Sequence, residues 1–582
     1  MILSASGWRK IFAISKNEQD KDPQISENDK KLSCICAWVF FDYLKKQTNQ
    51  ENLVIAIGTD TRPTGPSIAD AMLHALVKKG AIVQYCGVIA APEIMAFSKK
   101  IDGFIYISAS HNPIGHNGIK FGTNEGGVLN AQENAKVVND FLSILEDDEK
   151  VNDIYNKSLS CNNTELQNIY KTSESSKFNA KNAYYSFIQQ TITATDNKEY
   201  QADFFQMLKT YLAHKPLGVV CDFNGSSRSR SIDKEFFTHN GINFYSINED
   251  EIAHEIIPEG KNLEHVAKAM NTLHEKGHNE VLLGYMPDCD GDRGNIVYWD
   301  EKKGEAVILQ AQEVFSLSVL AELTYSLWQN EGKKDFNPAV CVNCPTSMRI
   351  NEITKALGVS LFRAEVGEAN VVNLAREKRE EGYDVRILGE GSNGGTITYP
   401  SSVRDPLNTL FAIIKLLTLK EEGLYKLWCE KSQKPYNEHF TLTDILESLP
   451  LYTTTGVSEK RALLQINTKD HTKLKQKFQT IFEKEWNEKK SELNQKNIFS
   501  YEAIITNGTK EAKNVSDFSS SGKGGLKLLL KDKNEEPFAF MWMRGSGTES
   551  VFRIMCDVKG NNSELEMWLC EWLTKMLLEA DK

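Results

Sequence analysis

The stretch GFIYISASHNPIGHNGIKF, residues 103–121, decides how the chain around it folds. Its first six residues mix aromatic and β-branched side chains in the alternating pattern of a strand, and Pro113, Gly115 and Gly118 exclude a regular element directly afterwards. We therefore expect Ser110 on a loop at the carboxyl end of a strand. Ligands of open α/β sheets bind at that edge, so this loop is a candidate functional site.

Outward from this stretch, strand-like and helix-like runs alternate over most of the 582 residues. The runs NLVIAIGTD, AIVQYCGVI, LGVVCDFNG and VLLGYMPDCD are typical of strands, and SIADAMLHALVKKG is typical of a helix. This alternation predicts an α/β fold with parallel sheets. A chain of this length exceeds what one hydrophobic core organises, so about four domains are expected.

The composition of the chain argues against some classes of binding partner. A hydrophobic content of 41% suits a globular protein, and the formal net charge of −11 argues against nucleic acid and against a membrane surface as partners. The eleven cysteines are scattered through strand-like contexts, which is typical of reduced thiols in a cytoplasmic protein. Cys341 and Cys344 form a CxxC, but no second pair at zinc-binding spacing accompanies it. We expect neither a signal peptide nor a membrane span.

The segment VLLGYMPDCDGDRGN carries three carboxylates directly after an apolar run. Asp288, Asp290 and Asp292 alternate along an extended chain, so their side chains can converge on one point. Adjacent carboxylates repel one another unless a cation neutralises them, and oxygen ligands favour Mg²⁺. A solvated acidic turn and a calcium-binding loop are alternatives, but Arg293 stands where the calcium loop requires glycine.

The segment RILGEGSNGGTIT, residues 386–398, is a third candidate loop. Glu390 and Ser392 follow a strand among several glycines, which would let backbone and short polar groups approach a polyhydroxylated ligand. A glycine-rich hairpin turn would have the same sequence.

The segment FAFMWMRGSGTESVFRIM predicts a strand, a loop and a second strand. Arg544, Ser546 and Thr548 offer a charge and hydrogen-bond donors suited to phosphate. Ser546 with Glu549 would also fit a helix capping box, but the strand pattern of VFRIM disfavours a helix.

Two polar stretches interrupt the α/β rhythm. Residues 146–180 indicate a surface insertion that leads into a linking helix, and residues 468–498 indicate a charged helix with apolar residues at helical spacing. The chain ends in ELEMWLCEWLTKMLLEA, whose apolar stripe predicts a helix packed on a small sheet.

Taken in order, SASHNP, DCDGDR, GEGS and RGSGTE resemble the four active-site loops of the α-D-phosphohexomutases, the phosphoglucomutase and phosphomannomutase superfamily. The resemblance implies three related mixed α/β domains and a smaller α+β carboxy-terminal domain around a central cleft. The expected domains are 1–195 with the phosphoserine loop, 196–302 with the metal loop, 303–430 with the sugar loop and 431–582 with the phosphate loop. SGWR, TDTR and DFNG also look similar to family features.

The resemblance also implies the role of each site residue. Ser110 would be the phosphorylated nucleophile and, with Asp288, Asp290 and Asp292, would bind Mg²⁺. Further implied catalytic residues are His111, Lys120, Arg9 and Arg293. The implied substrate-binding residues are Glu390, Ser392, Arg544, Ser546, Gly547 and Thr548.

The implied reaction interconverts a hexose 1-phosphate and a hexose 6-phosphate through a hexose 1,6-bisphosphate. Glucose is the expected sugar, because Asn393 and Gly394 stand where phosphomannomutases commonly have a histidine. Glucose 1,6-bisphosphate would then be the intermediate. Phosphomannomutase, phosphopentomutase and phosphoglucosamine mutase activities are alternatives on the same scaffold.

The sequence departs from the family pattern at several places. Cys289 replaces a common glycine or proline and should point away from the metal, Ala364 and Ala369 stand in a loop that often carries Thr and Lys, and Ser550 replaces a frequent proline.

Three other functions compete with a mutase. An aspartyl-phosphate phosphotransferase of the haloacid dehalogenase class would need Thr or Val where Asp292 stands, and a serine hydrolase would need G-x-S-x-G around Ser110. A sugar-phosphate-binding regulator without catalysis is the third.

Overall fold

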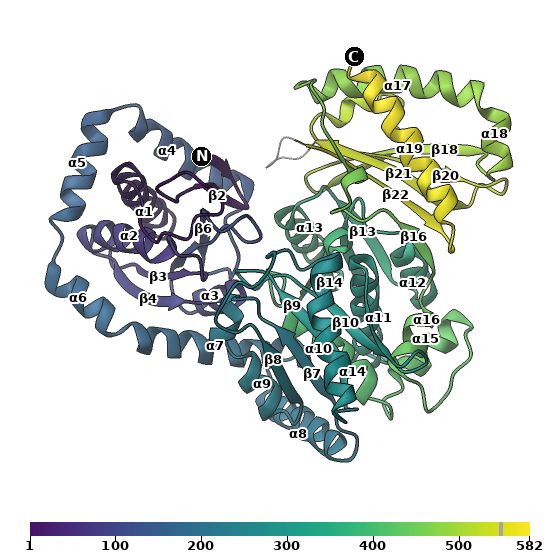
Figure 1. The fold of residues 1–582 in the computed structure, drawn as a ribbon, viewed down its shortest axis with the longest axis horizontal. Helices are drawn as coiled ribbons and strands as arrows, with labels where there is room; N and C mark the ends of the chain where they lie inside the picture. The colour runs from purple at the N-terminus through teal and green to yellow at the C-terminus, as the bar shows by residue number, and fades with distance from the viewer. Residues whose placement is uncertain (546–550) are drawn as a thin grey trace. The chain divides into compact units, whose positions relative to one another are not determined.

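The computed structural model describes residues 1–545 and 551–582, and this part of the chain has the α/β class that the sequence predicts, with four sheets (Figure 1). It forms two compact units. Unit 1 comprises Met1–Trp299, Ala306–Ile308 and Pro400–Leu410; unit 2 comprises Asp300–Glu305, Leu309–Tyr399 and Phe411–Lys582.

The first sheet of unit 1 contains the strand that precedes Ser110. Its six strands lie in the order β1-β2-β6-β5-β3-β4. Their bounds are β1 Ile2–Ser4, β2 Gly7–Ile11, β3 Val54–Thr59, β4 Ile82–Val88, β5 Gly103–Ile107 and β6 His116–Thr123. The predicted strand is confirmed as β5, buried along its whole length.

This sheet is mixed rather than wholly parallel. β3 pairs in parallel with β4 and β5, whereas β5 pairs antiparallel with β6. The eight residues between β5 and β6 are too few for a parallel crossover, so the chain must return antiparallel. The prediction of parallel sheets is therefore correct for the middle of this sheet and wrong for the edge that follows Ser110.

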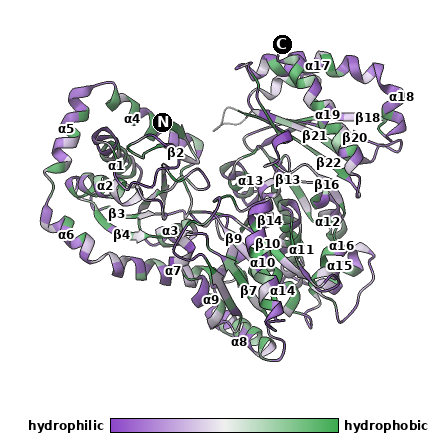
Figure 2. Cartoon of the chain, viewed as in Figure 1, coloured by the Kyte–Doolittle hydropathy of each residue, from purple (hydrophilic) through white to green (hydrophobic). Residues whose placement is uncertain are grey.

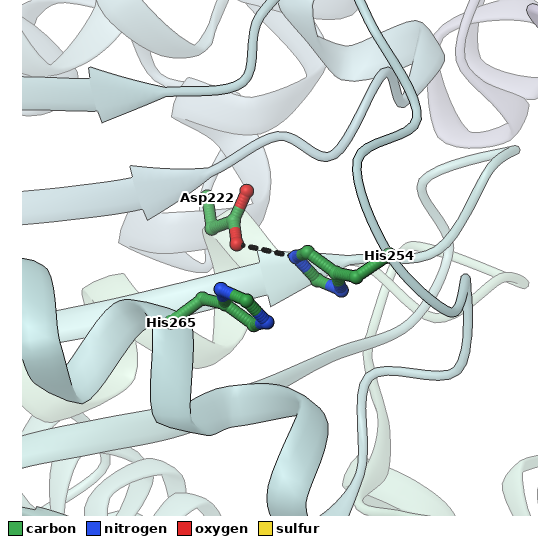
Figure 3. Close-up of side chains that lie close together, drawn as sticks. All are labelled: Asp222, His254 and His265. Atoms are coloured by element: carbon green, nitrogen blue, oxygen red, sulfur yellow. Dashed lines mark hydrogen bonds and ion pairs between the residues drawn. The ribbon is translucent and has the colours of Figure 1, made fainter.

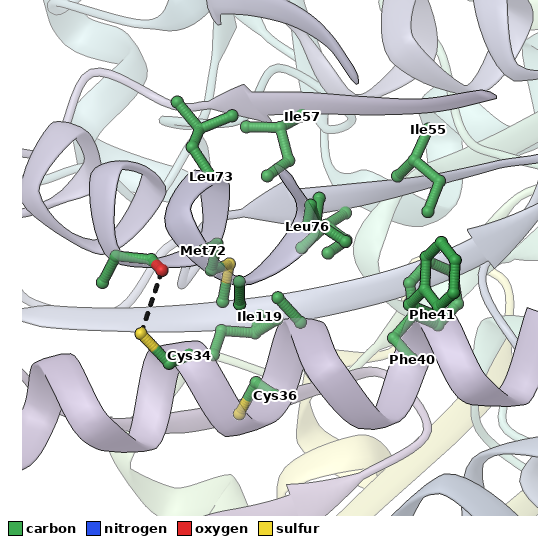
Figure 4. Packing of buried hydrophobic residues seen from close by; sticks show 14 of the residues in the cluster. Cys34, Cys36, Phe40, Phe41, Ile55, Ile57, Met72, Leu73, Leu76 and Ile119 are labelled. Atoms are coloured by element: carbon green, nitrogen blue, oxygen red, sulfur yellow. Dashed lines mark hydrogen bonds between the residues drawn. The ribbon is translucent and has the colours of Figure 1, made fainter. Parts of the chain in front are cut away.

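The core of this region lies between the sheet and the helices α1 (Glu27–Thr48) and α2 (Gly65–Lys79). Cys34, Phe40, Ile57 and Met72 are among its buried side chains, and Cys34 hydrogen-bonds the Ala71 carbonyl (Figure 4). Burying each large apolar side chain contributes about 1.5–3 kcal/mol, so this core stabilises the sheet that contains β5, the strand before Ser110.

The polar stretch 146–180, expected to be a surface insertion that leads into a linking helix, is almost wholly helical. The helices around it are α3 Ala91–Ser98, α4 Ala131–Leu145, α5 Asp148–Leu159, α6 Asn163–Lys171 and α7 Ser173–Thr193. Ile154, Tyr155, Leu166 and Ile169 join the first core, while the other faces stay hydrophilic, and Figure 2 shows this mixture along the helices. The expected linking helix is α7.

The second sheet of unit 1 has the order β11-β10-β9-β7-β8 and carries the acidic loop at the end of β9. Its strands are β7 Gly218–Asp222, β8 Asn243–Ile247, β9 Val281–Pro287, β10 Gly294–Asp300 and β11 Glu305–Ile308. The neighbouring helices in sequence are α8 Lys198–His214, α9 Asp233–His239 and α10 Glu264–Glu275.

Unit 2 contains the third sheet, ordered β13-β12-β14-β15. Its strands are β12 Pro338–Asn343, β13 Ser360–Ala364, β14 Asp384–Glu390 and β15 Gly395–Thr398. The helices of this part of the sequence are α11 Ala311–Gln329, α12 Arg349–Leu357, α13 Glu368–Glu380, α14 Pro406–Thr418, α15 Leu424–Ser432 and α16 Leu442–Ser448.

The fourth sheet, also in unit 2, is antiparallel and has the order β16-β22-β21-β20-β18-β19, with β17 paired to β22. Its strands are β16 Tyr452–Thr454, β17 Leu463–Leu464, β18 Ser500–Asn507, β19 Lys510–Lys513, β20 Gly525–Lys531, β21 Pro537–Gly545 and β22 Phe552–Lys559. The two predicted strands around the RGSGTE loop are confirmed as β21 and β22.

Helices cover one face of this fourth sheet. They are α17 His471–Glu488, α18 Lys490–Gln495 and α19 Ser563–Ala580. Phe478 and Phe482 of α17 and Leu569 and Trp572 of α19 share one core with the sheet, which confirms both helix predictions made from apolar spacing. In the described part of the chain, every helix is too short or too polar to traverse a bilayer.

Candidate active site

Ser110 occupies a strained position on the loop after β5. Its φ is 54°, in the left-handed region that residues other than glycine seldom adopt, and its side chain is buried. The Ser110 amide donates to Ser108 Oγ at 2.9 Å. Strain of this kind persists only where the surroundings fix the backbone, and it concentrates at functional sites.

Arg62 supplies that fixation. Its Nη2 donates to the carbonyl oxygens of Ser110 at 2.7 Å and Asn112 at 2.5 Å, and its Nη1 donates to that of Pro113 at 2.6 Å. Asp60 holds the Nε of the same guanidinium at 3.1 Å. Both side chains are fully buried, so the Arg62 guanidinium has no water to replace these acceptors. The TDTR segment resembles a family feature, but its sequence does not indicate which loop Arg62 binds.

The three carboxylates that follow β9 converge, as their spacing predicts. One oxygen from each of Asp288, Asp290 and Asp292 lies within 4.8 Å of the others, and all three residues are buried. Ser110 Oγ donates to Asp288 Oδ2 at 2.7 Å, which brings the serine of the first sheet onto the acidic loop of the second. The two residues are 178 positions apart in sequence.

Cations compensate the acidic triplet. Lys120 Nζ lies 2.7 Å from Asp290 Oδ2, and Arg404 Nη2 lies 2.9 Å from Asp292 Oδ2. Burial raises the pKa of Asp290, but Lys120 outweighs burial and holds that pKa below its usual range. Burial, with the charges of Asp290 and Asp292, raises the pKa of Asp288 well above its usual range. Among the described side chains, the positive charge near Asp288, which includes Arg293 Nε at 3.9 Å, is therefore too small to offset its burial and the two neighbouring carboxylates.

The triplet fits a divalent cation. Asp290 Oδ1 and Asp292 Oδ1 are buried without a hydrogen-bond partner among the described residues. A buried carboxylate oxygen with no partner costs free energy, and a bound cation would remove that cost. With Ser110 Oγ nearby, these oxygens form the hard donor set that Mg²⁺ prefers.

Arg9, His111 and Arg293 surround the same point. The Nε atoms of Arg9 and Arg293 are buried and have no hydrogen-bond partner in the described chain, and Arg9 Nη1 donates to Asn112 Oδ1 at 3.2 Å. His111 Nδ1 lies 3.4 Å from Ser110 Oγ. Arg293, burial and Arg9 together lower the pKa of His111 well below its usual value, so the imidazole is neutral near pH 7. The cluster suits an anion of high charge density.

A second buried arginine holds the acidic loop. Arg228 Nη1 donates to the Gly291 carbonyl at 3.1 Å, and Ser226 Oγ donates to the Asp288 carbonyl at 2.6 Å. Gly291 has φ +72°, and a Cβ there would lie 2.3 Å from Arg228 Cγ, so glycine is required. Cys289 Sγ lies 3.3 Å from Thr61 Oγ1, which agrees with the expectation that it points away from the carboxylates.

In unit 2, the two predicted residues of the third loop, Glu390 and Ser392, both contact Asn343. Asn343 Nδ2 donates to Glu390 Oε1 at 3.0 Å and to Ser392 Oγ at 3.2 Å, and the Gly367 amide donates to Glu390 Oε1 at 2.8 Å. Glu390 pairs with Gly395 across the β14–β15 hairpin. The alternative of a glycine-rich hairpin is therefore correct for the backbone, and it leaves two polar side chains held side by side.

Arg544 is the one predicted residue of the fourth loop that the described chain contains. It lies at the end of β21, where its Nε is 3.1 Å from Glu365 Oε1. Ser546, Gly547 and Thr548 lie outside the described residues, as does the alternative capping pair Ser546 and Glu549.

A second group of metal-ligand side chains lies at the end of β7. Asp222 Oδ2 and His254 Nε2 are 2.7 Å apart, and the His254 and His265 rings stack with centroids 4.0 Å apart and an interplanar angle of 3° (Figure 3). A metal bound to two imidazoles must lie in the plane of both rings, which two stacked parallel rings do not allow. The Asp288 triplet is therefore the better cation site.

Cysteines do not contribute to either group of candidate metal ligands found in the described chain. All eleven are free and buried.

Comparison with known proteins identifies the class that this fold and site define. Residues 7–148 match the family model described as phosphoglucomutase/phosphomannomutase, alpha/beta/alpha domain I, and residues 318–434 match domain III of the same family. Together with the fold, these two matches support the phosphoglucomutase/phosphomannomutase superfamily, a class of intramolecular phosphotransferases, as the class of this chain.

Particular relatives and structures agree with that class. The chain is 25% identical over 425 residues to a phosphoglucosamine mutase of Thermodesulfovibrio yellowstonii, a match that covers 72% of this chain and 81% of the relative. It is 26% identical over 414 residues to a phosphoglucosamine mutase of Campylobacter curvus, covering 70% and 79%.

Two solved structures share the fold. One is pp63/parafusin (phosphoglucomutase) from Paramecium, with a TM-score of 0.62 and 14% identity, covering 100% of this chain and 94% of that one. The other is a phosphoglucomutase/phosphomannomutase family protein from Burkholderia thailandensis, with a TM-score of 0.60 and 15% identity, covering 100% and 97%.

Proposed function

We propose that the protein is a phosphohexomutase that interconverts a hexose 1-phosphate and a hexose 6-phosphate through phospho-Ser110. One observation carries the proposal: Ser110 Oγ lies 2.7 Å from Asp288 within a buried triplet that keeps two carboxylate oxygens without hydrogen-bond partners among the described residues. A serine hydroxyl, a cation site and two arginines at one point are what phosphoryl transfer requires.

In the first step a sugar hydroxyl oxygen attacks the phosphorus of phospho-Ser110, and the bond from phosphorus to Ser110 Oγ breaks. The sugar proton leaves to a base and Ser110 Oγ regains one, so the transfer balances. Lys120 is our proposed acid and base. It lies at the triplet, and although burial lowers its pKa, the attraction of Asp290 raises that pKa and keeps the amine protonated. It therefore first gives its proton to Ser110 Oγ, and the neutral amine that results accepts the proton of the sugar hydroxyl. The neutral His111 imidazole can hold the Ser110 hydroxyl proton.

The charge of the transferred group is met by fixed cations. Arg9 and Arg293 present buried Nε donors at the site, so no side chain has to reorganise during the transfer. Mg²⁺, held by Asp288, Asp290, Asp292 and the Ser110 oxygen, would polarise the phosphoryl oxygens and offset their charge.

The second half of the reaction returns phosphate to Ser110 from the other end of the hexose 1,6-bisphosphate. That intermediate must therefore be recognised in two orientations. We assign Glu390 and Ser392 to the sugar hydroxyls and Arg544, with Ser546, Gly547 and Thr548, to the phosphate that is not reacting. The domains 1–195, 196–302, 303–430 and 431–582 are part of this proposal, as is a cytoplasmic location.

The sugar has two candidates. Asn393 and Gly394 favour glucose over mannose, as the sequence indicated, with glucose 1,6-bisphosphate as intermediate. The relatives from Thermodesulfovibrio yellowstonii and Campylobacter curvus are named phosphoglucosamine mutases, which favours glucosamine. A panel of glucose, glucosamine, mannose and ribose 1-phosphates, compared by kcat/KM, distinguishes them.

The test of the proposed function is turnover of this panel by the wild-type protein and by Ser110→Ala. We expect Mg²⁺-dependent interconversion that Ser110→Ala abolishes. A wild-type protein that binds these sugar phosphates without turning any over would be a regulator instead. A trapped phosphoprotein that is labile to acid would indicate an acyl phosphate, as in the haloacid dehalogenase class.

A further inference from the structure

The segment of residues 365–367, which follows β13, links the two substrate-binding regions predicted in unit 2. Glu365 is 4% exposed, and its carboxylate is surrounded by donors. Oε2 accepts from the Gly525 amide at 2.5 Å and from Thr506 Oγ1 at 3.0 Å, and Oε1 accepts from the Val366 amide at 2.7 Å. A carboxylate that accepts from three donors is fixed in orientation.

Arg544 contacts this fixed carboxylate. Its Nε lies 3.1 Å from Glu365 Oε1, although the N–H is not aligned for a hydrogen bond, so the contact is an ion pair. Glu365 is largely buried and Arg544 is 23% exposed at its side chain, so water screens the pair only in part. Because Glu365 is the better fixed partner, it determines where the Arg544 guanidinium lies.

The surroundings of Arg544 would otherwise repel it. Arg553 is its direct partner in the antiparallel register of β21 and β22, which places two arginines on one face of the sheet. Lys475 adds a third cation: burial lowers its pKa to about 8, Glu365 raises that pKa and Arg544 lowers it. Glu365 offsets part of this positive charge, since it contacts Arg544 and raises the pKa of Lys475.

The backbone of the same segment reaches the sugar-binding pair. The Gly367 amide donates to Glu390 Oε1 at 2.8 Å, two residues beyond Glu365. A shift of Glu365 would therefore move Arg544 through the ion pair and move Glu390 through the backbone of this segment. The segment joins a strand end of the third sheet to β20 and β21 of the fourth.

We propose that Glu365 is a positioning residue for substrate recognition: it orients Arg544 toward the sugar's distal phosphate and links Arg544 to Glu390. This inference rests on the proposed function. A guanidinium has two edges for bidentate binding, and Glu365 faces the Nε end. The edge formed by Nη1 and Nη2 is then the one directed to phosphate.

The test is Glu365→Gln in the full-length Mg²⁺-loaded protein, with two readouts. We expect KM for the preferred sugar 1-phosphate and the Kd for inorganic phosphate each to rise about tenfold, while kcat changes less than about twofold. The reason is that the ion pair is lost and one of the two acceptor oxygens becomes an NH2 group that faces other donors. The control Glu502→Gln removes an equal charge from the same sheet, where Glu502 pairs with Lys531 at 3.0 Å, and should change neither value.

A fall in the Kd for phosphate, instead of the expected rise, would contradict the proposal. If Glu365 only dampened the positive potential around Arg544, Glu365→Gln would bind phosphate more tightly, and unchanged or tighter binding overturns the proposal. Glu365→Gln should also have no further effect on phosphate binding in an Arg544→Lys background, because it acts through that arginine; additive losses would contradict this.

Two measurements separate failure of the Glu365 proposal from misfolding of the variant and from failure of the proposed function. If Glu365→Gln does not fold, Thr506→Val removes one of the three donors to the carboxylate, and we expect it to weaken phosphate binding about threefold; no change would overturn the proposal. Phosphate binding is measured without turnover, so a wild-type protein inactive on every sugar phosphate would refute the proposed function while the Glu365 effect on binding is still read directly.

Discussion

The Ser110 region of unit 1 and the Glu390 and Arg544 region of unit 2 are built differently. In unit 1 the serine and the acidic triplet are buried, and two buried arginines hold their loops from behind. In unit 2 the predicted residues come from two sheets, and a hydrogen bond from Asn343 and an ion pair with Glu365 hold them. Phosphoryl transfer requires fixed positions, whereas a sugar that binds in two orientations requires recognition groups that suit both.

This difference predicts which kinetic constant each region controls. Substitutions around Ser110 should lower kcat, because they disturb groups that act in the transition state. Substitutions in unit 2 should mainly raise KM.

The largest effect is expected from Asp290→Asn, which removes a charge from the triplet and the partner of Lys120. We expect a loss of about 10³-fold in kcat and weaker binding of Mn²⁺, measured by electron paramagnetic resonance. The matched control is Asp222→Asn in the group with the stacked histidines. If Asp222→Asn weakened Mn²⁺ binding and Asp290→Asn did not, the metal would belong to the other group.

The next largest effect should come from Arg62→Lys, since the single nitrogen of a lysine cannot replace the three nitrogens with which Arg62 binds Asp60 and the loop carbonyls. We expect kcat to fall about 100-fold and the melting temperature to fall as well, because buried carbonyls lose their donors. Arg230→Lys, at an exposed arginine paired with Asp250, serves as the control. A normal kcat for Arg62→Lys would show that the strained backbone at Ser110 does not depend on it.

Glu390→Gln tests the predicted sugar-binding region of unit 2. The carboxylate binds Asn343 and the Gly367 amide, and an amide in its place keeps the shape but loses charge and one acceptor. We expect KM to rise about tenfold with a smaller change in kcat. A loss confined to kcat would mean that Glu390 acts in phosphoryl transfer, and the division between the two regions would fail.

The smallest effect is expected from Cys289→Ser. Its side chain lies against Thr61 rather than the carboxylates, so kcat should stay within about twofold of wild type. Measuring kcat over a range of Mg²⁺ concentrations makes the test specific. A Mg²⁺ requirement that shifts strongly would place the Cys289 side chain in the cation site.

Features of the fold that depend on residues close together in the chain can be predicted from the sequence. The strand before Ser110, the spacing of the three aspartates and the two strands around the fourth loop follow from residue patterns a few positions long, and all are present. The parallel-sheet prediction fails after β5, because the short return to β6 forces an antiparallel edge. The polar composition of residues 146–180 predicts a surface insertion, yet one face of its helices packs into the core.

The groups that hold the site are not found from the sequence, because they are distant along the chain. Arg404 reaches Asp292 across 112 residues, and Glu365 reaches the Gly525 amide across 160. No local pattern marks an arginine or a glutamate as the partner of a loop that far away. The sequence offers one indication: Asp60 and Arg62 lie directly after a strand, which suits a buried ion pair. It does not indicate which loop Arg62 binds.

The most direct test of the central claim is to map the phosphate on the protein. The Mg²⁺-loaded protein is incubated with the 1,6-bisphosphate of its preferred hexose, digested and sequenced by mass spectrometry. Phosphate on Ser110 alone, lost in Ser110→Ala, is the result predicted here. Phosphate on Asp288, or no covalent phosphate in a protein that still interconverts the two sugar phosphates, would contradict it.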